Sequence, residues 1–174
     1  MKTMIRMLCL LCLFLFVFNL TGCSNSSDQL RDALAAYSNM IDQGIPDDLL
    51  LTIYYMDPFI CTRIPLSAND LMQNSMTQKI VVHSEALKNN SSALKKLDWS
   101  LLSPVKAEYP MDARIHYVIE KENGEKLLEV TISRFKDIAI LVNHIEVEEN
   151  PVFYELIYPF LPEDARKLVE RLVC

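Results

Sequence analysis

The chain has 174 residues, about half of them hydrophobic, and its 17 basic and 23 acidic side chains give a formal net charge of −6 at pH 7. This length suits one domain with a sizeable hydrophobic core. Nucleic acids and anionic lipid surfaces are bound by cationic faces, so the acidic balance argues against both as partners.

The N-terminal stretch has the parts of a secretory signal. Lys2 and Arg6 precede an apolar run, residues 7–18, which ends at Asn19. This run is too short for a membrane-spanning helix, which needs roughly 20 apolar residues, and it fits the hydrophobic region of a cleavable signal. We therefore expect residues 1–22 to be removed. The leader carries two basic residues and no acidic one, so its removal shifts the net charge further toward acid.

The sequence Leu20-Thr21-Gly22-Cys23 closes this leader. An aliphatic residue and two small residues before a cysteine resemble the lipobox of bacterial lipoproteins. The resemblance covers residues 1–23 and implies that Cys23 is acylated and anchors the chain to the extracytoplasmic side of the cell membrane. Acyl chains contribute about 0.8 kcal/mol per buried methylene, so two or three of them anchor stably. Residues 23–28 are then a lipidated N-terminus with a short tether, and residues 29–174 form a single globular domain.

Helical spacing of apolar residues over 29–41 predicts the first element of this domain, an amphipathic helix. Residues 49–56 are apolar, aromatic and β-branched, which is typical of a strand buried on both faces. A second strand is expected over 79–83.

Two capping signals mark shorter helices between and after these strands. Ser67 with Asp70 three residues later forms an approximate capping box. Asn90 precedes two serines and predicts a cap for a further helical turn that carries Leu94 and Leu97.

The clearest tertiary signal lies between Asp112 and Val147. Apolar residues alternate with a mixed set over 113–120, so one strand face is apolar and the other mixed. Asn123-Gly124 suits a two-residue type I′ turn, in which both central residues need positive φ. This turn would pair Glu122 with Glu125. The same register sets three apolar residues of one strand opposite three of the next: Ile119, Tyr117 and Ile115 opposite Leu128, Val130 and Ile132.

The rest of the chain predicts more sheet and then two helices. Residues 138–142 continue the sheet, and Asn143-His144 is expected to turn the chain back along 145–147, in preference to one straight strand. Asn150-Pro151 and Pro162 are helix-start signals. The fold class is therefore α+β: an antiparallel β-meander over about 112–147, extended by strands from the first half, with helices packed on it.

Local catalytic motifs are weak. Ser92 and Lys95 match S-x-x-K, the spacing of a serine nucleophile and a lysine in penicillin-recognising enzymes, but no K-T-G follows and Ser103 with Lys106 matches the same pattern. The predicted mature chain has two glycines, so it cannot build a P-loop, a dinucleotide fingerprint or a nucleophile elbow. We predict no catalytic site and no cofactor.

Histidines and cysteines give no metal-ligand spacing. His83, His116 and His144 fall on or beside separate strands and are expected to be partly exposed, so no metal site is predicted. Outside the leader and Cys23, Cys61 and Cys174 remain, and two thiols so far apart are expected to be free.

The sequence favours a binding or accessory module at the membrane surface, whose partner is an envelope protein or a small-molecule ligand. Rigid aromatic rings are efficient contact residues and could line a groove, although such residues more often belong to the core. The candidates are Tyr54, Tyr55, Trp99 and Tyr109. The alternative is an envelope hydrolase with a dispersed Ser, His and carboxylate site, for example Ser84 or Ser92 with His83 or His116.

Overall fold

The structure is a computed structural model that describes residues 26–98, 100, 102–106, 110–135 and 138–173. The predicted signal, lipobox and Cys23 lie outside these residues, as do Trp99, Tyr109 and Cys174. The buried hydrophobic residues fall between Leu30 and Val169. A chain that begins at Ser24 therefore contains the complete described core.

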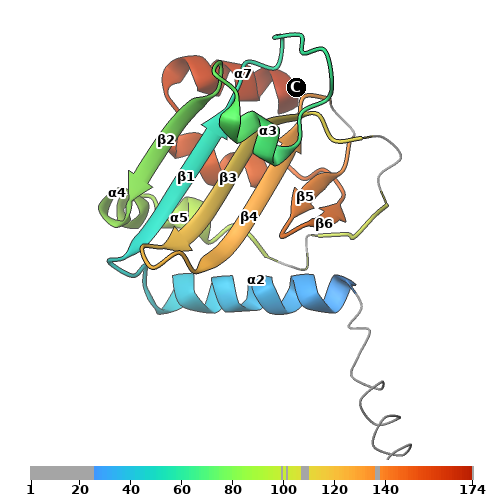
Figure 1. Cartoon of the computed structure of the whole chain (residues 1–174). Helices are drawn as coiled ribbons and strands as arrows, with labels where there is room; N and C mark the ends of the chain where they lie inside the picture. Colours follow the sequence, from blue (N-terminus) through green and yellow to red (C-terminus); the bar gives the residue numbers. More distant parts are fainter. Residues whose placement is uncertain (1–25, 99, 101, 107–109, 136–137, 174) are drawn as a thin grey trace, which may run out of the picture.

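A six-stranded antiparallel sheet is the centre of the fold (Figure 1), with strand order β2-β1-β3-β4-β5-β6. The predicted meander is β3 to β6, and β1 and β2 extend it from the first half, so the α+β prediction is confirmed. The strands are β1 Leu49–Tyr55, β2 Gln78–His83, β3 Ala113–Lys121, β4 Lys126–Ser133, β5 Ile140–Val142 and β6 Ile145–Val147.

Most helices pack on one face of this sheet. Figure 1 shows α6 and α7 behind the strands and α2 across the end at which β1 begins, whereas α3 lies in front of the opposite face. The helices are α2 Ser26–Gln43, α3 Ala68–Gln73, α4 Ser84–Asn89, α5 Ser91–Leu94, α6 Val152–Ile157, the 3-10 turn η2 Tyr158–Phe160, and α7 Glu163–Val173.

Alternation along β3 and β4 forms the main core, as predicted. Ile115 pairs with Ile132, Tyr117 with Val130, and Ile119 with Leu128, and all six side chains are buried. Apolar residues of α2, α6 and α7 join the same cluster. Along β1, one face is fully buried and the other only partly, at Leu50 and Tyr54, so burial on both faces was predicted correctly only in part.

The β3–β4 turn is not the predicted type I′ turn. The Gly124 amide donates to the Lys121 carbonyl at 2.8 Å, and the Lys121 amide donates to Glu125 at 3.0 Å, so three residues form the loop and Glu122 does not pair with Glu125. Gly124 has φ +86, whereas Asn123 has no positive φ. A type I turn followed by a left-handed glycine is the usual three-residue hairpin. A register shift between Ile119 and Glu120 then restores the predicted core pairs.

The predicted turn at Asn143-His144 is present, and it is this turn that has two positive φ angles, +47 at Asn143 and +67 at His144. Neither residue is glycine. The Asn143 side chain accepts a hydrogen bond from the Glu129 amide at 2.8 Å, and the Asn143 amide donates to the Glu129 carbonyl at 2.8 Å. These bonds to β4 hold Asn143 in a conformation that asparagine tolerates better than most residues.

The helix-start signals are confirmed with one exception. Ser67 and Asp70 form the capping box, and the Asn150 side chain accepts from the Val152 amide at 3.0 Å at the start of α6. Asn90 does not cap α5 with its side chain; instead it donates to the Ala86 carbonyl at 3.0 Å. The expected strand over 138–142 is shorter, beginning at Ile140.

The mixed face of β3 is more buried than its sequence suggests. Arg114 is fully buried, and its guanidinium donates to Asp112 at 2.6 Å and to the Ile60 carbonyl at 3.2 Å. Asp112 also accepts from the Leu66 amide at 3.0 Å and pairs with Arg134 at 3.0 Å. This buried ion cluster ties the loop between β1 and α3 over one end of the sheet.

Replacing Gly124 with valine should destabilise the fold by about 1 kcal/mol or more, because a β-branched residue is strained at positive φ. An added Cβ meets no atom within 4 Å, so the cost comes from the backbone conformation. The measurement is urea unfolding, with Glu122→Val in the same turn as the control, since Glu122 has no positive φ. Equal midpoints for the two variants would contradict the turn geometry.

Candidate functional site

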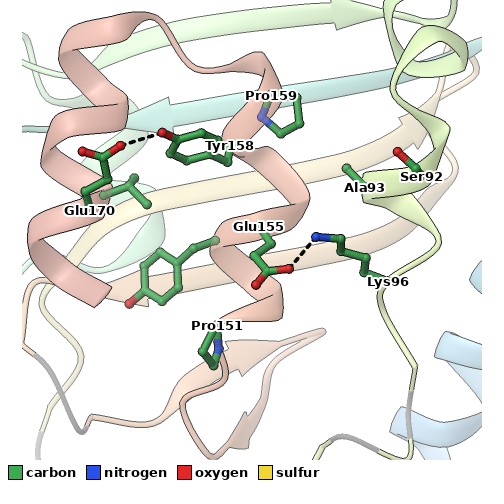
Figure 2. Close-up of a pocket in the computed structure, with 10 residues that line it drawn as sticks. Ser92, Ala93, Lys96, Pro151, Glu155, Tyr158, Pro159 and Glu170 are labelled. Atoms are coloured by element: carbon green, nitrogen blue, oxygen red, sulfur yellow. Dashed lines mark hydrogen bonds and ion pairs between the residues drawn. The ribbon is translucent and has the colours of Figure 1, made fainter. Parts of the chain in front are cut away.

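A groove of about 390 Å³ lies on the helical side of the sheet. Three segments far apart in the sequence form it: α5 with the residues just after it, α6 with η2, and α7 (Figure 2). Its lining is mostly apolar. The lining residues are Ser92, Ala93, Lys96, Pro151, Tyr154, Glu155, Tyr158, Pro159, Val169 and Glu170.

Two buried tyrosines fix the helices that form the groove. Tyr117, on the central strand, donates its hydroxyl to the Phe153 carbonyl of α6 at 3.0 Å. Tyr37 of α2 donates to the Leu94 carbonyl at the end of α5, also at 3.0 Å, and so satisfies a terminal carbonyl of that helix. Burial raises the pKa of both hydroxyls, so both remain protonated donors.

Two ion or hydrogen-bonded pairs lie on the two sides of α6 (Figure 2). Lys96 donates to Glu155 at 2.7 Å on the α5 side. Tyr158 donates its hydroxyl to Glu170 at 2.6 Å on the α7 side, and this bond is the main reason that the pKa of Tyr158 is raised. Both pairs lie at the rim of the groove, where the carboxylates are exposed.

Tyr154 and the η2 turn complete the floor. Burial, followed by the nearby Glu149 carboxylate, raises the pKa of Tyr154, whose hydroxyl donates to Glu149 at 2.9 Å. Arg166 of α7 donates to the carbonyls of Tyr158 and Pro159 at 3.1 and 3.0 Å. The floor is therefore held by hydrogen bonds to α7 and to the segment before α6.

The tyrosines predicted from the sequence do not line this groove. Adjacent residues of a strand point to opposite faces. Tyr54 lies beside His116 on the face away from the helical core, with ring centroids 6.1 Å apart, while Tyr55 joins that core and donates to Gln78 at 2.5 Å. The other two candidates, Trp99 and Tyr109, lie outside the described residues.

The hydrolase residues are not brought together. Ser92 lines the groove, but no hydrogen bond joins Ser84 or Ser92 to a histidine within the part of the chain that the structure describes. Lys95 lies 3.8 Å from Asp42, and Ser103 belongs to an extended segment beside β6, where its carbonyl accepts from the Glu148 amide.

His116 differs most from its prediction. It was expected to be partly exposed and is fully buried, whereas His83 and His144 are exposed. Its Nδ1 lies 2.9 Å from the Thr131 hydroxyl, and its Nε2 has no hydrogen-bond partner among the described residues. Glu129 lies 3.9 Å from Nε2 and also accepts from Lys126 at 2.7 Å.

Burial lowers the pKa of His116, although the Glu129 carboxylate opposes this shift. The pKa of Glu129 is lowered. Its partial burial alone would raise this pKa, but the opposite effects of Lys126, His116 and His144 together outweigh burial. Both shifts favour a neutral His116 beside an ionised Glu129.

The described residues contain no group of three or more histidine, cysteine, aspartate or glutamate side chains that could hold a metal ion. Cys61 is a free, exposed thiol. In the same part of the chain, no helix combines the length and apolar character needed to cross a bilayer. A scan against protein-family models and searches of curated proteins and of solved structures find no match to this chain.

Stability should fall as the pH drops below about 6.5, the ordinary pKa of histidine, because His116 has a lowered pKa in the folded protein and binds a proton more readily when unfolded. The measurement is the free energy of unfolding between about pH 7.5 and 5. His116→Asn should flatten this pH dependence relative to wild type, whereas His83→Asn at an exposed site should not. Parallel curves for wild type and His116→Asn would contradict the expectation.

Proposed function

We propose that this protein is a lipoprotein anchored through Cys23 on the extracytoplasmic side of the cell membrane, and that it acts as a binding module through the groove between α5, α6 and α7. The observation that carries the binding role is the groove itself. Its volume of about 390 Å³ lies within the usual 300–1,000 Å³ of small-molecule sites, and apolar and aromatic side chains dominate its lining.

Two features of the sequence support the anchor: a leader in which basic residues precede an apolar run, and the lipobox-like Leu20-Thr21-Gly22-Cys23. Helix α2 begins at Ser26, three residues after this cysteine. Three extended residues reach at most about 10 Å. A lipid on Cys23 would therefore keep the domain close to the membrane surface and would restrict its ligands to molecules or proteins found there.

The hydrolase alternative receives no support from the positions of its residues. A serine nucleophile needs a base within hydrogen-bond reach and a carboxylate that orients this base. The buried His116 has a neighbouring carboxylate, Glu129, but its hydroxyl partner is Thr131, which is itself buried. Ser92 lies in the groove, on the other side of the sheet.

Expression of the full chain with a labelled fatty acid tests the anchor. Cys23→Ala should abolish incorporation of the label, because the lipid thioether needs this thiol. Cys61→Ala should leave incorporation unchanged, since Cys61 is an exposed thiol that lies outside the lipobox. Undiminished label in Cys23→Ala would overturn the anchor.

Binding of the neutral dye Nile red to the chain from Ser24 onward tests the groove. Its fluorescence should rise on binding to wild type, and Ser92→Trp should reduce the affinity by about tenfold or more, because an indole at this exposed lining position would fill the groove. Glu122→Trp, in the distant β3–β4 turn, is the control. Equal affinity in wild type and a folded Ser92→Trp variant would contradict a ligand role for the groove.

A further inference from the structure

We infer that the groove selects organic cations: its ligand is a small molecule, or the terminal group of a larger one, with an apolar body and an ammonium-type charge. This inference rests on the proposed binding role of the groove. It follows from the charge pairs at the rim, from the direction of α7 and from the two tyrosine rings.

The lining carries one unbalanced negative charge. Lys96 and Glu155 neutralise each other at 2.7 Å. Glu170 accepts a hydrogen bond from the Tyr158 hydroxyl, which is a neutral donor. The carboxylate of Glu170 is therefore left without a cationic partner among the lining residues. A cationic ligand group beside it would gain a charge-assisted hydrogen bond that no residue of the lining supplies.

Helix α7 adds to the negative potential at this place. It runs from Glu163 to Val173, so Glu170 lies in its last turn. The carbonyl groups at a helix C-terminus carry roughly half a negative charge, and this end of a helix favours cations. Among the α7 side chains that the structure describes, Lys167 does not offset this potential at Glu170, because it pairs with Glu163 at 2.7 Å.

Arg166 is a further cation close to the groove, and its guanidinium has other partners. Its guanidinium donates to the carbonyls of Tyr158 and Pro159 and lies 5.4 Å from the centre of the Tyr158 ring. It thus balances the carbonyl end of α6 and η2, and it is not one of the lining residues. Its position over Tyr158 shows that a cation is accommodated against this ring.

The apolar floor determines the rest of the ligand. Pro151, Tyr154, Tyr158, Pro159 and Val169 present rings and a branched side chain along α6 and α7. Such a floor favours an apolar or aromatic body, and tyrosine faces also attract ammonium groups. An anionic ligand of the same shape would meet the Glu170 carboxylate and the end of α7, so it should be rejected.

Three probes of similar size and different charge test this selection: 2-phenylethylammonium, 3-phenylpropionate and the neutral 3-phenylpropan-1-ol. Each is titrated against Nile red bound to the chain from Ser24 onward. The cation should displace the dye at concentrations about fivefold lower than the neutral probe, which corresponds to a partly exposed ion pair, and the anion should be weakest.

Variants at Glu170 identify the charge responsible. Glu170→Gln should remove the preference for the cation, and Glu170→Lys should reverse it in favour of 3-phenylpropionate. Glu122→Gln makes the same change in net charge in the distant β3–β4 turn and should leave the order of the probes unchanged. An equal loss in Glu122→Gln would mean that net charge, not the groove, attracts the cation, and would overturn the inference.

The inference and the proposed function fail in different ways. If Nile red binds in a manner sensitive to Ser92→Trp but all three probes displace it equally, the groove remains a ligand site and its selection of cations is wrong. If Nile red binding is insensitive to Ser92→Trp, the groove is not the binding site and both ideas are wrong.

Discussion

The groove depends on two phenol hydroxyls that are buried inside the core. Tyr117 joins the central strand to α6, and Tyr37 joins α2 to the end of α5, each by a hydrogen bond of 3.0 Å to a backbone carbonyl. Loss of either hydroxyl would leave a buried carbonyl short of a partner, at a cost of about 1–3 kcal/mol. Core residues therefore position the helices that form the groove, and the lining residues are not needed for this task.

The two faces of the sheet are stabilised by different interactions, apolar packing on one and buried polar and charged contacts on the other. The helical face is a continuous apolar core. On the opposite face, Arg114 and His116 of β3 are both fully buried, one paired with Asp112 and the other beside Thr131 and Glu129. A buried charge needs its partners in place, so this face gains specificity of loop placement more than net stability. The groove lies on the apolar side, away from these polar clusters.

Local patterns were enough to predict the meander, the three core pairs of β3 and β4, and most helix starts, because alternation, capping and turn chemistry are recorded in neighbouring residues. They did not separate the two turn types, since glycine at position 124 fits two kinds of hairpin. Strand alternation predicts that Tyr54 and Tyr55 point to opposite faces of the sheet, and the sequence-based proposal that both line one groove did not take this into account. The groove was not predictable in this way, because Lys96, Tyr158 and Glu170 meet only through tertiary packing.

The order of strands in the sheet also has a consequence for how the chain assembles. The β3-to-β6 meander joins neighbours in sequence, and closing its short loops costs little entropy. By contrast, β1 pairs with β3 although β2 and the helices α3, α4 and α5 lie between them in the chain. The two tyrosine hydrogen bonds span 57 and 36 residues. Contacts between distant segments form more slowly than local ones. We therefore expect the groove to form late in folding, after the sheet that supports it.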